Sequence, residues 1–149
     1  ELKLSGAETE THVQDLLDTL NDHDLLEGHL FHTLDRSSAD ELKTLLPNTT
    51  IGYIMPFAGL GIPQTHADFL VLEESSANSA MQRNTADAGL GYVVWTVNTK
   101  EALNIRMIEG ADAVITDRPD WGLTAREHLQ EESGLAGRLS HIMASLFTV

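Results

Sequence analysis

The chain has 149 residues, with 23 acidic and 9 basic side chains and a formal net charge of −14. Its length allows one domain with a real core, and its charge argues against a nucleic-acid surface, which needs clustered Lys and Arg. The lack of cysteine excludes a disulfide framework and a Cys-ligated metal, and no run of about 18 apolar residues could span a membrane.

Hydrophobic periodicity predicts that strands and helices alternate along the chain. Helices are expected over residues 9–20, from a capping box at 38–41 to Pro47, from Asn78 to Gly89, and from Asn98 to Gly110. Strands are expected at residues 30–34, 51–55, 69–72, 92–97 and 113–116, with a residual strand at 1–4. Strand starts recur about every 20 residues, which is the length of a βα unit and indicates parallel strands.

The stretch Tyr92–Asn98 indicates a strand that is buried on both faces, because apolar residues alternate with residues that are themselves largely apolar. Parallel α/β folds place binding groups at the carboxyl ends of such strands. Trp95 and Thr116, near two of these ends, are therefore candidates for contact with a ligand. Trp95 could instead be a core residue, and Asp117 could hold a turn. Asn98 is expected to cap the following helix.

The first residues also contain candidate site groups. Glu1 and Lys3 are two positions apart on an expected strand, so both face the inside of the sheet if Leu2 and Leu4 face the helices. A carboxylate suits a hard divalent cation, and an ammonium suits a phosphate. Alternatively, both are exposed residues at a frayed terminus.

Three segments together resemble the glycerophosphodiester phosphodiesterase family: Glu1-Leu2-Lys3, the Trp-Thr-Val-Asn at 95–98, and the Val-Ile-Thr-Asp-Arg-Pro-Asp at 114–120. The resemblance covers residues 1–121. It implies an α/β fold, a partial (β/α)8 TIM-type barrel comprising strands three to eight, with parallel strands and outer helices. Residues 122–149, with a capping box at 124–127 and an apolar stripe from Leu135 to Leu146, are expected to form a helical segment that packs on the barrel. A membrane-surface or partner helix is the alternative for this segment.

The same resemblance implies metal-dependent hydrolysis of glycerophosphodiesters to sn-glycerol 3-phosphate and an alcohol in the intact protein. By this resemblance Glu1 is a ligand of Ca²⁺ or Mg²⁺, Lys3 is a catalytic residue near the phosphate, and Trp95 lines the substrate pocket, with Thr116 added as a substrate-binding candidate. The family's His-Arg-Gly and Glu-x-Asp motifs, and with them its catalytic histidines, do not occur in this sequence. The fragment is therefore expected to be inactive alone, and to self-associate or pair with a missing N-terminal part of the barrel.

Other expectations rest on weaker patterns. The loop and strand at 56–77 resemble the bacterial branch whose members carry an N-terminal membrane domain, which predicts a soluble domain of a membrane-associated protein on an unknown side of the membrane. His32 could face the barrel mouth, and Glu73 is either a further carboxylate there or simply solvated. The alternative to an enzyme is a non-catalytic α/β binding or interaction module that pairs through open sheet edges.

Overall fold

The computed structural model describes residues 1–5, 7–56 and 61–131, which are built around one parallel sheet. Its strands are β1 (Leu30–Thr33), β2 (Thr50–Met55), β3 (Phe69–Glu73), β4 (Gly91–Trp95) and β5 (Ala113–Val114). They pair in the order β1-β2-β3-β4-β5, and every neighbouring pair is parallel. The predicted strands at 51–55, 69–72, 92–97 and 113–116 are thus confirmed as adjacent and parallel.

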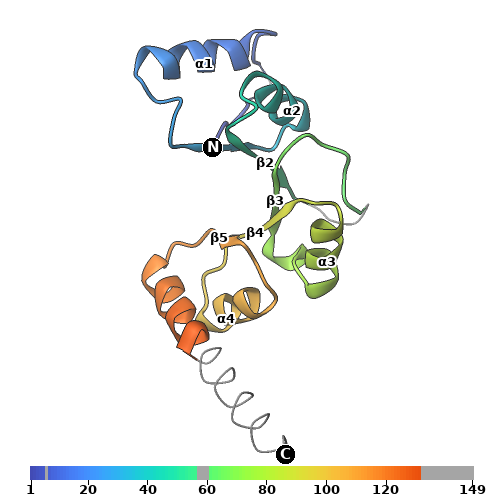
Figure 1. The fold of residues 1–149 in the computed structure, drawn as a ribbon, viewed down its shortest axis with the longest axis vertical. Coiled ribbons are helices and arrows are strands. Elements are labelled where there is room, and N and C mark those ends of the chain that lie inside the picture. The colour runs from blue at the N-terminus through green and yellow to red at the C-terminus, as the bar shows by residue number, and fades with distance from the viewer. Residues whose placement is uncertain (6, 57–60, 132–149) are drawn as a thin grey trace, which may run out of the picture.

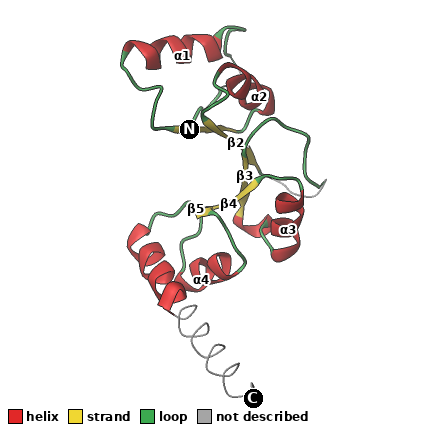
Figure 2. Cartoon of the chain, viewed as in Figure 1, coloured by secondary structure: helices red, strands yellow, loops and turns green. Residues whose placement is uncertain are grey.

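Helices alternate with most of the strands, although the described residues between β2 and β3 contain none. They are α1 (His12–Asp22), α2 (Arg36–Leu45), α3 (Ser79–Asp87) and α4 (Lys100–Ile108), with a short 3-10 helix η1 (Glu74–Ser76), and residues 119–131 are also helical. Figure 1 shows the strands following an arc, with α2, α3 and α4 on its outer side. The described strands do not close into a ring, as Figure 2 shows, so this is the predicted partial barrel.

The expected first strand is reduced to a single pairing. Leu2 forms an isolated parallel bridge with Thr33, and its N–H donates to the His32 carbonyl oxygen at 2.9 Å. The described residues therefore contain five strands and one bridge rather than the six predicted strands.

Both faces of the central strands are buried, as expected for parallel strands in a barrel. Leu72 and Val94 point to the helix layer, where they join a core with Leu103 of α4, and all three are fully buried. On the opposite face, which lines the inside of the arc, a smaller cluster contains Ile54, Phe69, Val71 and Val93, with Trp95 packed against it. This inner face is the one that would line the interior of a complete barrel.

Helix starts differ from the sequence predictions in three places. Asp35, not Ser38, caps α2, because its carboxylate accepts the Ser38 N–H at 2.7 Å. Thr99, not Asn98, caps α4 by accepting the Ala102 N–H at 3.1 Å. Thr124 lies inside the helix at 119–131, and its hydroxyl donates to the Asp120 carbonyl oxygen. The cap of α2 therefore lies closer to the end of β1 than predicted, whereas the cap of α4 lies one residue farther from the end of β4.

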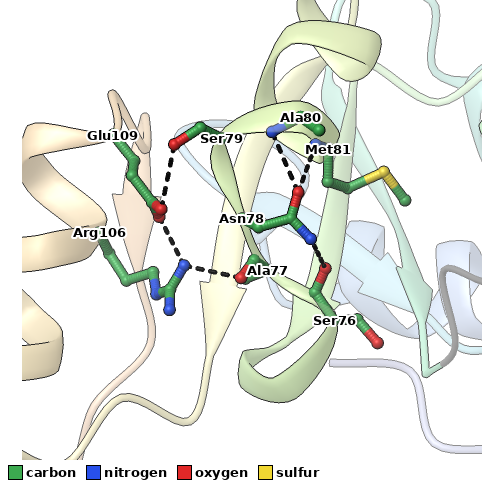
Figure 3. Close-up of polar contacts among 8 residues, drawn as sticks. All are labelled: Ser76, Ala77, Asn78, Ser79, Ala80, Met81, Arg106 and Glu109. Atoms are coloured by element: carbon green, nitrogen blue, oxygen red, sulfur yellow. Dashed lines mark hydrogen bonds and ion pairs between the residues drawn. The ribbon is translucent and has the colours of Figure 1, made fainter.

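The start of α3 lies at the expected place, is capped by Asn78 and is tied to α4. The Asn78 side-chain oxygen accepts the N–H groups of Ala80 and Met81 at 3.0 and 2.9 Å (Figure 3). Arg106 of α4 donates to the Ala77 carbonyl oxygen at 2.8 Å and pairs with Glu109. These contacts fix the stagger of neighbouring helices outside β3 and β4. The predicted stripe at 135–146 lies outside the described residues.

Candidate functional site at the carboxyl ends of the strands

Glu1 and Lys3 lie at the carboxyl edge of the sheet. Leu2 pairs with Thr33, the last residue of β1, and packs with the core under α1 and α2. Its two neighbours therefore point to the inner face, as the sequence predicted. The Lys3 ammonium is 3.7 Å from the Glu1 carboxylate, and the Lys3 side chain is 77% exposed. So long and exposed an ion pair contributes little stability and leaves the ammonium accessible.

His32 occupies the same inner face beside Glu1. The bridge between Leu2 and Thr33 sets Glu1 opposite His32 across the pairing. His32 is half-buried, and its Nδ1 atom is buried with no hydrogen-bond partner among the described residues. Burial lowers the pKa of the His32 imidazole, and the Glu1 carboxylate acts in the opposite direction.

Trp95 ends β4 on the inner face. It is half-buried against Ile54, Phe69, Val71 and Val93, and its indole N–H is buried without a partner within the part of the chain that the structure describes. An unpaired buried donor is costly, and such atoms deserve a specific explanation. The neighbouring residue in register on β3 is Glu73, whose carboxylate instead accepts the Ser75 N–H at 2.9 Å and begins η1.

The turns after β4 and β5 are joined by Asn98. Its side-chain oxygen accepts the Asp117 N–H at 2.9 Å and the Thr116 hydroxyl at 3.3 Å, and its amide donates to the Asp117 carboxylate at 2.7 Å. The Thr116 hydroxyl also accepts the Arg118 N–H at 2.9 Å. Asp117 therefore holds a turn, as one of the two sequence interpretations proposed, and the Thr116 hydroxyl has already donated its hydrogen to Asn98.

The four predicted site residues lie at one edge, but in two groups. Glu1 and Lys3 flank β1, whereas Trp95 ends β4 and Thr116 follows β5, so β2 and β3 separate the two groups along the sheet. Their assignment to substrate or metal stays a prediction.

Solved structures share this architecture. A glycerophosphodiester phosphodiesterase from Parabacteroides distasonis aligns with a TM-score of 0.67 and 16% identity over 88% of this chain and 57% of its own. An Oleispira antarctica phosphodiesterase in complex with the product sn-glycerol-3-phosphate aligns with a TM-score of 0.65 and 18% identity, over 77% of this chain and 49% of its own. A glycerophosphodiester phosphodiesterase from Agrobacterium tumefaciens aligns with a TM-score of 0.58 and 11% identity, over 77% of this chain and 52% of its own.

This chain has the glycerophosphodiester phosphodiesterase fold. It spans about half the length of each of these structures, at 57%, 49% and 52% of their chains. No protein-family model and no curated protein matches the sequence. The predicted resemblance is thus confirmed at the level of the fold, and the activity of the whole protein is a matter for proposal.

The metal implied by the glycerophosphodiester phosphodiesterase resemblance can be tested against the residues present. Glu1 offers one carboxylate at the expected place, but no group of three carboxylate, imidazole or thiol side chains suited to an ion occurs in residues 1–5, 7–56 and 61–131. A hard divalent cation takes six or more oxygen ligands, with water filling those that the protein leaves open. The described residues therefore do not make a complete metal site.

Two residues at this edge of the fold have a place that the sequence pattern does not indicate. His32 was only one of several possibilities, because a single imidazole within a short strand carries no spacing signal. Asn98 is predicted to cap a helix, although the Asn-Thr pair offers two capping residues in succession.

Within the described ranges, no helix is long and apolar enough to cross a bilayer.

Proposed function

We propose that the intact protein hydrolyses glycerophosphodiesters to sn-glycerol 3-phosphate and an alcohol, with Ca²⁺ or Mg²⁺. The observation that carries the proposal is the Glu1–Lys3 pair, which lies on the inner face at the carboxyl edge of a sheet with this fold. Active sites of (β/α)8 barrels form at that edge. The phosphodiesterase from Oleispira antarctica, which shares the fold, binds sn-glycerol-3-phosphate.

Within this proposal the residues of the chain have separate roles. Glu1 supplies one carboxylate to the cation, and the exposed Lys3 ammonium neutralises a phosphate oxygen. The half-buried Trp95 ring bounds the substrate pocket on the opposite side of the mouth. A bound divalent ion supplies Lewis-acid polarisation of the phosphodiester. Thr116 contributes less than the motif implied, because its hydroxyl hydrogen already serves Asn98.

The 149-residue chain alone is proposed to lack activity. It offers one metal-binding carboxylate at the mouth, and His32 is the one imidazole that the described residues place there. Acid–base catalysis of this reaction class needs groups within hydrogen-bond reach of the reacting oxygens. The remaining groups would come from a further N-terminal part of the barrel, which would also pair with the exposed edge beside Leu2. Self-association is the other way to cover that edge.

The test compares the chain with a longer form of the protein that includes the preceding barrel strands. With glycerophosphocholine and excess Ca²⁺ or Mg²⁺, the chain alone should release no sn-glycerol 3-phosphate, whereas the longer form should release it. In the longer form, Glu1→Ala should lower turnover about a thousandfold or more, because a metal's stabilisation of the transition state amounts to several kcal/mol. Glu41→Ala, on the exposed surface of α2, is the matched control.

Retention of near-normal turnover by Glu1→Ala would exclude its role as a ligand. Turnover by the monomeric 149-residue chain would show that the catalytic groups are not the ones proposed.

The association of this protein with a membrane remains a prediction from the 56–77 pattern alone.

A second candidate function is an interaction module that pairs through its sheet edges. It is favoured by β5, which has only two residues, and by the single bridge at Leu2, because both edges leave backbone groups available for pairing. An inactive longer form that still binds a partner with the affinity of the shorter chain would favour this function over hydrolysis.

A further inference from the structure

One imidazole shares the inner face with the Glu1–Lys3 pair. Thr33 is fully buried and Leu2 packs in the core under α1 and α2, so both point to the helix layer. Side chains alternate along a strand, so His32 and Glu1 point the opposite way, into the mouth. Paired strands lie about 4.8 Å apart. The His32 ring and the Glu1 and Lys3 side chains therefore form one cluster.

The buried nitrogen of His32 fixes the form of its ring. Nδ1 is buried and no described residue provides a hydrogen-bond partner for it. A buried N–H donor without an acceptor is rarely tolerated, so Nδ1 is better left unprotonated. A neutral imidazole then carries its hydrogen on Nε2, and that N–H is the donor that remains for a ligand.

Two other histidines, His29 and His12, are placed differently. His29 precedes β1 at the amino edge of the sheet, and its ring contacts the Glu27 carbonyl oxygen at 2.7 Å. His12 is in α1 and its ring contacts the Ser38 hydroxyl at 2.9 Å. The ring of His32, by contrast, lies at the carboxyl edge, on the same face as Lys3, whose side chain is 77% exposed. An imidazole N–H and an ammonium that share one face are suited to an anionic group that accepts several hydrogen bonds, such as a phosphate.

We propose that His32 is a ligand-binding residue of this mouth, and that its Nε2–H donates to an oxygen of a phosphate monoester that the Lys3 ammonium also contacts. The choice of a glycerol phosphate as ligand rests on the proposed function, whereas the phosphate contact rests on the cluster itself. The Glu1 carboxylate repels an anion, so the affinity of the chain alone should be weak, with a Kd of about 1 mM.

The experiment follows the histidine ring signals of the full 149-residue chain by two-dimensional ¹H–¹³C NMR. Separate titrations with sn-glycerol 3-phosphate, inorganic phosphate and glycerol should shift the His32 ring signals with the two phosphates and not with glycerol. A lower Kd for sn-glycerol 3-phosphate than for phosphate would indicate an additional contact between the protein and the glycerol group. Equal values would limit the ligand class to phosphate itself.

The variants separate a direct contact from a structural role. His32→Ala should weaken phosphate binding about tenfold, as expected for the loss of one hydrogen bond to a charged group. His32→Gln, which keeps an N–H donor, should recover part of that loss. His29→Ala, at the other end of β1, should bind as the unaltered chain does. Thermal unfolding of each variant checks that the fold is kept.

Unchanged phosphate binding by both His32 variants would overturn the inference and leave the proposed function standing. Absence of phosphate binding by the unaltered chain would overturn it as well. The proposed function fails on a different result, which is absence of turnover by the longer form of the protein.

Discussion

The two edges of the sheet differ in how far their polar groups are paired. At the amino edge, Asp68 accepts the Ile51 N–H and the Lys43 ammonium, both at 2.8 Å, and Asp112 accepts the Tyr92 N–H at 2.8 Å. At the carboxyl edge, His32 and Trp95 have buried nitrogen atoms with no partner in the described ranges, although Asn98 and Asp117 are paired. The amino edge is built for stability, and part of the carboxyl edge leaves its polar groups free.

The difference between the edges separates polar groups that stabilise the fold from polar groups that could bind a ligand. Asp68 and Asp112 each precede a strand, and each closes the start of the strand before it, so the same structural device recurs two βα units apart. Carboxylates of this kind stabilise the fold whatever the protein binds. Groups whose hydrogen-bonding capacity is unused, by contrast, are the ones available to a ligand.

The largest stability effect is expected at the amino edge. Asp68→Ala should lower the free energy of unfolding by about 2 kcal/mol, because the buried Ile51 N–H loses its side-chain acceptor, while the half-exposed contact with Lys43 adds little. Asp112→Ala is the matched control without a lysine partner and should also cost about 2 kcal/mol, because the Tyr92 N–H loses its acceptor in the same way. Urea unfolding measures both. An unchanged midpoint for Asp68→Ala would break the distinction between the two edges.

A smaller effect, dependent on pH, is expected at the cap of α2. Hydrogen bonds from the Ser37 and Ser38 hydroxyls lower the pKa of the Asp35 carboxyl. Its contribution is therefore fully present above the ordinary carboxyl pKa of about 3.9 and is lost as the pH falls through the lower folded value. Asp35→Ala should cost about 1 kcal/mol at pH 7.

Urea unfolding of Asp35→Ala at neutral and acidic pH gives the measurement. The difference from the unaltered chain should shrink below about pH 4. Asp35→Asn is the control, because asparagine also caps helices but does not titrate in this range. A cost for Asp35→Ala that is the same at both pH values would show that the charge of the carboxylate is not what stabilises α2.

The smallest effect is expected at Trp95. Trp95→Phe should change the free energy of unfolding by less than about 1 kcal/mol, because lost ring packing and removal of an unpaired buried N–H act in opposite directions. Val93→Ala, on the same face of β4, relieves no polar group and should cost more. A loss of several kcal/mol in thermal or urea unfolding of Trp95→Phe would mean that the indole N–H is satisfied in solution.

The order and direction of the strands could be predicted because local patterns carry that information. A βα repeat of about 20 residues forces parallel strands, and apolar runs such as 69–72 mark strands that are buried on both faces. Helix starts were less predictable. Asp35, Ser37 and Ser38 are all plausible caps, and only the position where β1 leaves the sheet decides which of them meets a free N–H.

The placement of the candidate site residues could be predicted in part, and for an identifiable reason. Glu1 and Lys3 share the inner face as their spacing implied, because alternation along a strand is a local property. Asn98 and Asp117 are 19 residues apart, and no local pattern indicates that the turns after β4 and β5 meet. His32 lies beside Glu1 only because Leu2 pairs with Thr33, and no local pattern predicts that pairing.

The sequence by itself determined the βα repeat, the two-sided burial of the central strands and the inward direction of Glu1 and Lys3. These follow from periodicities of the backbone that any local segment expresses. Only the tertiary structure decided which polar groups are used and which are left free. A hydrogen-bond partner in a parallel sheet comes from a neighbouring unit, so the free nitrogen atoms of His32 and Trp95 become visible only when the strands lie side by side.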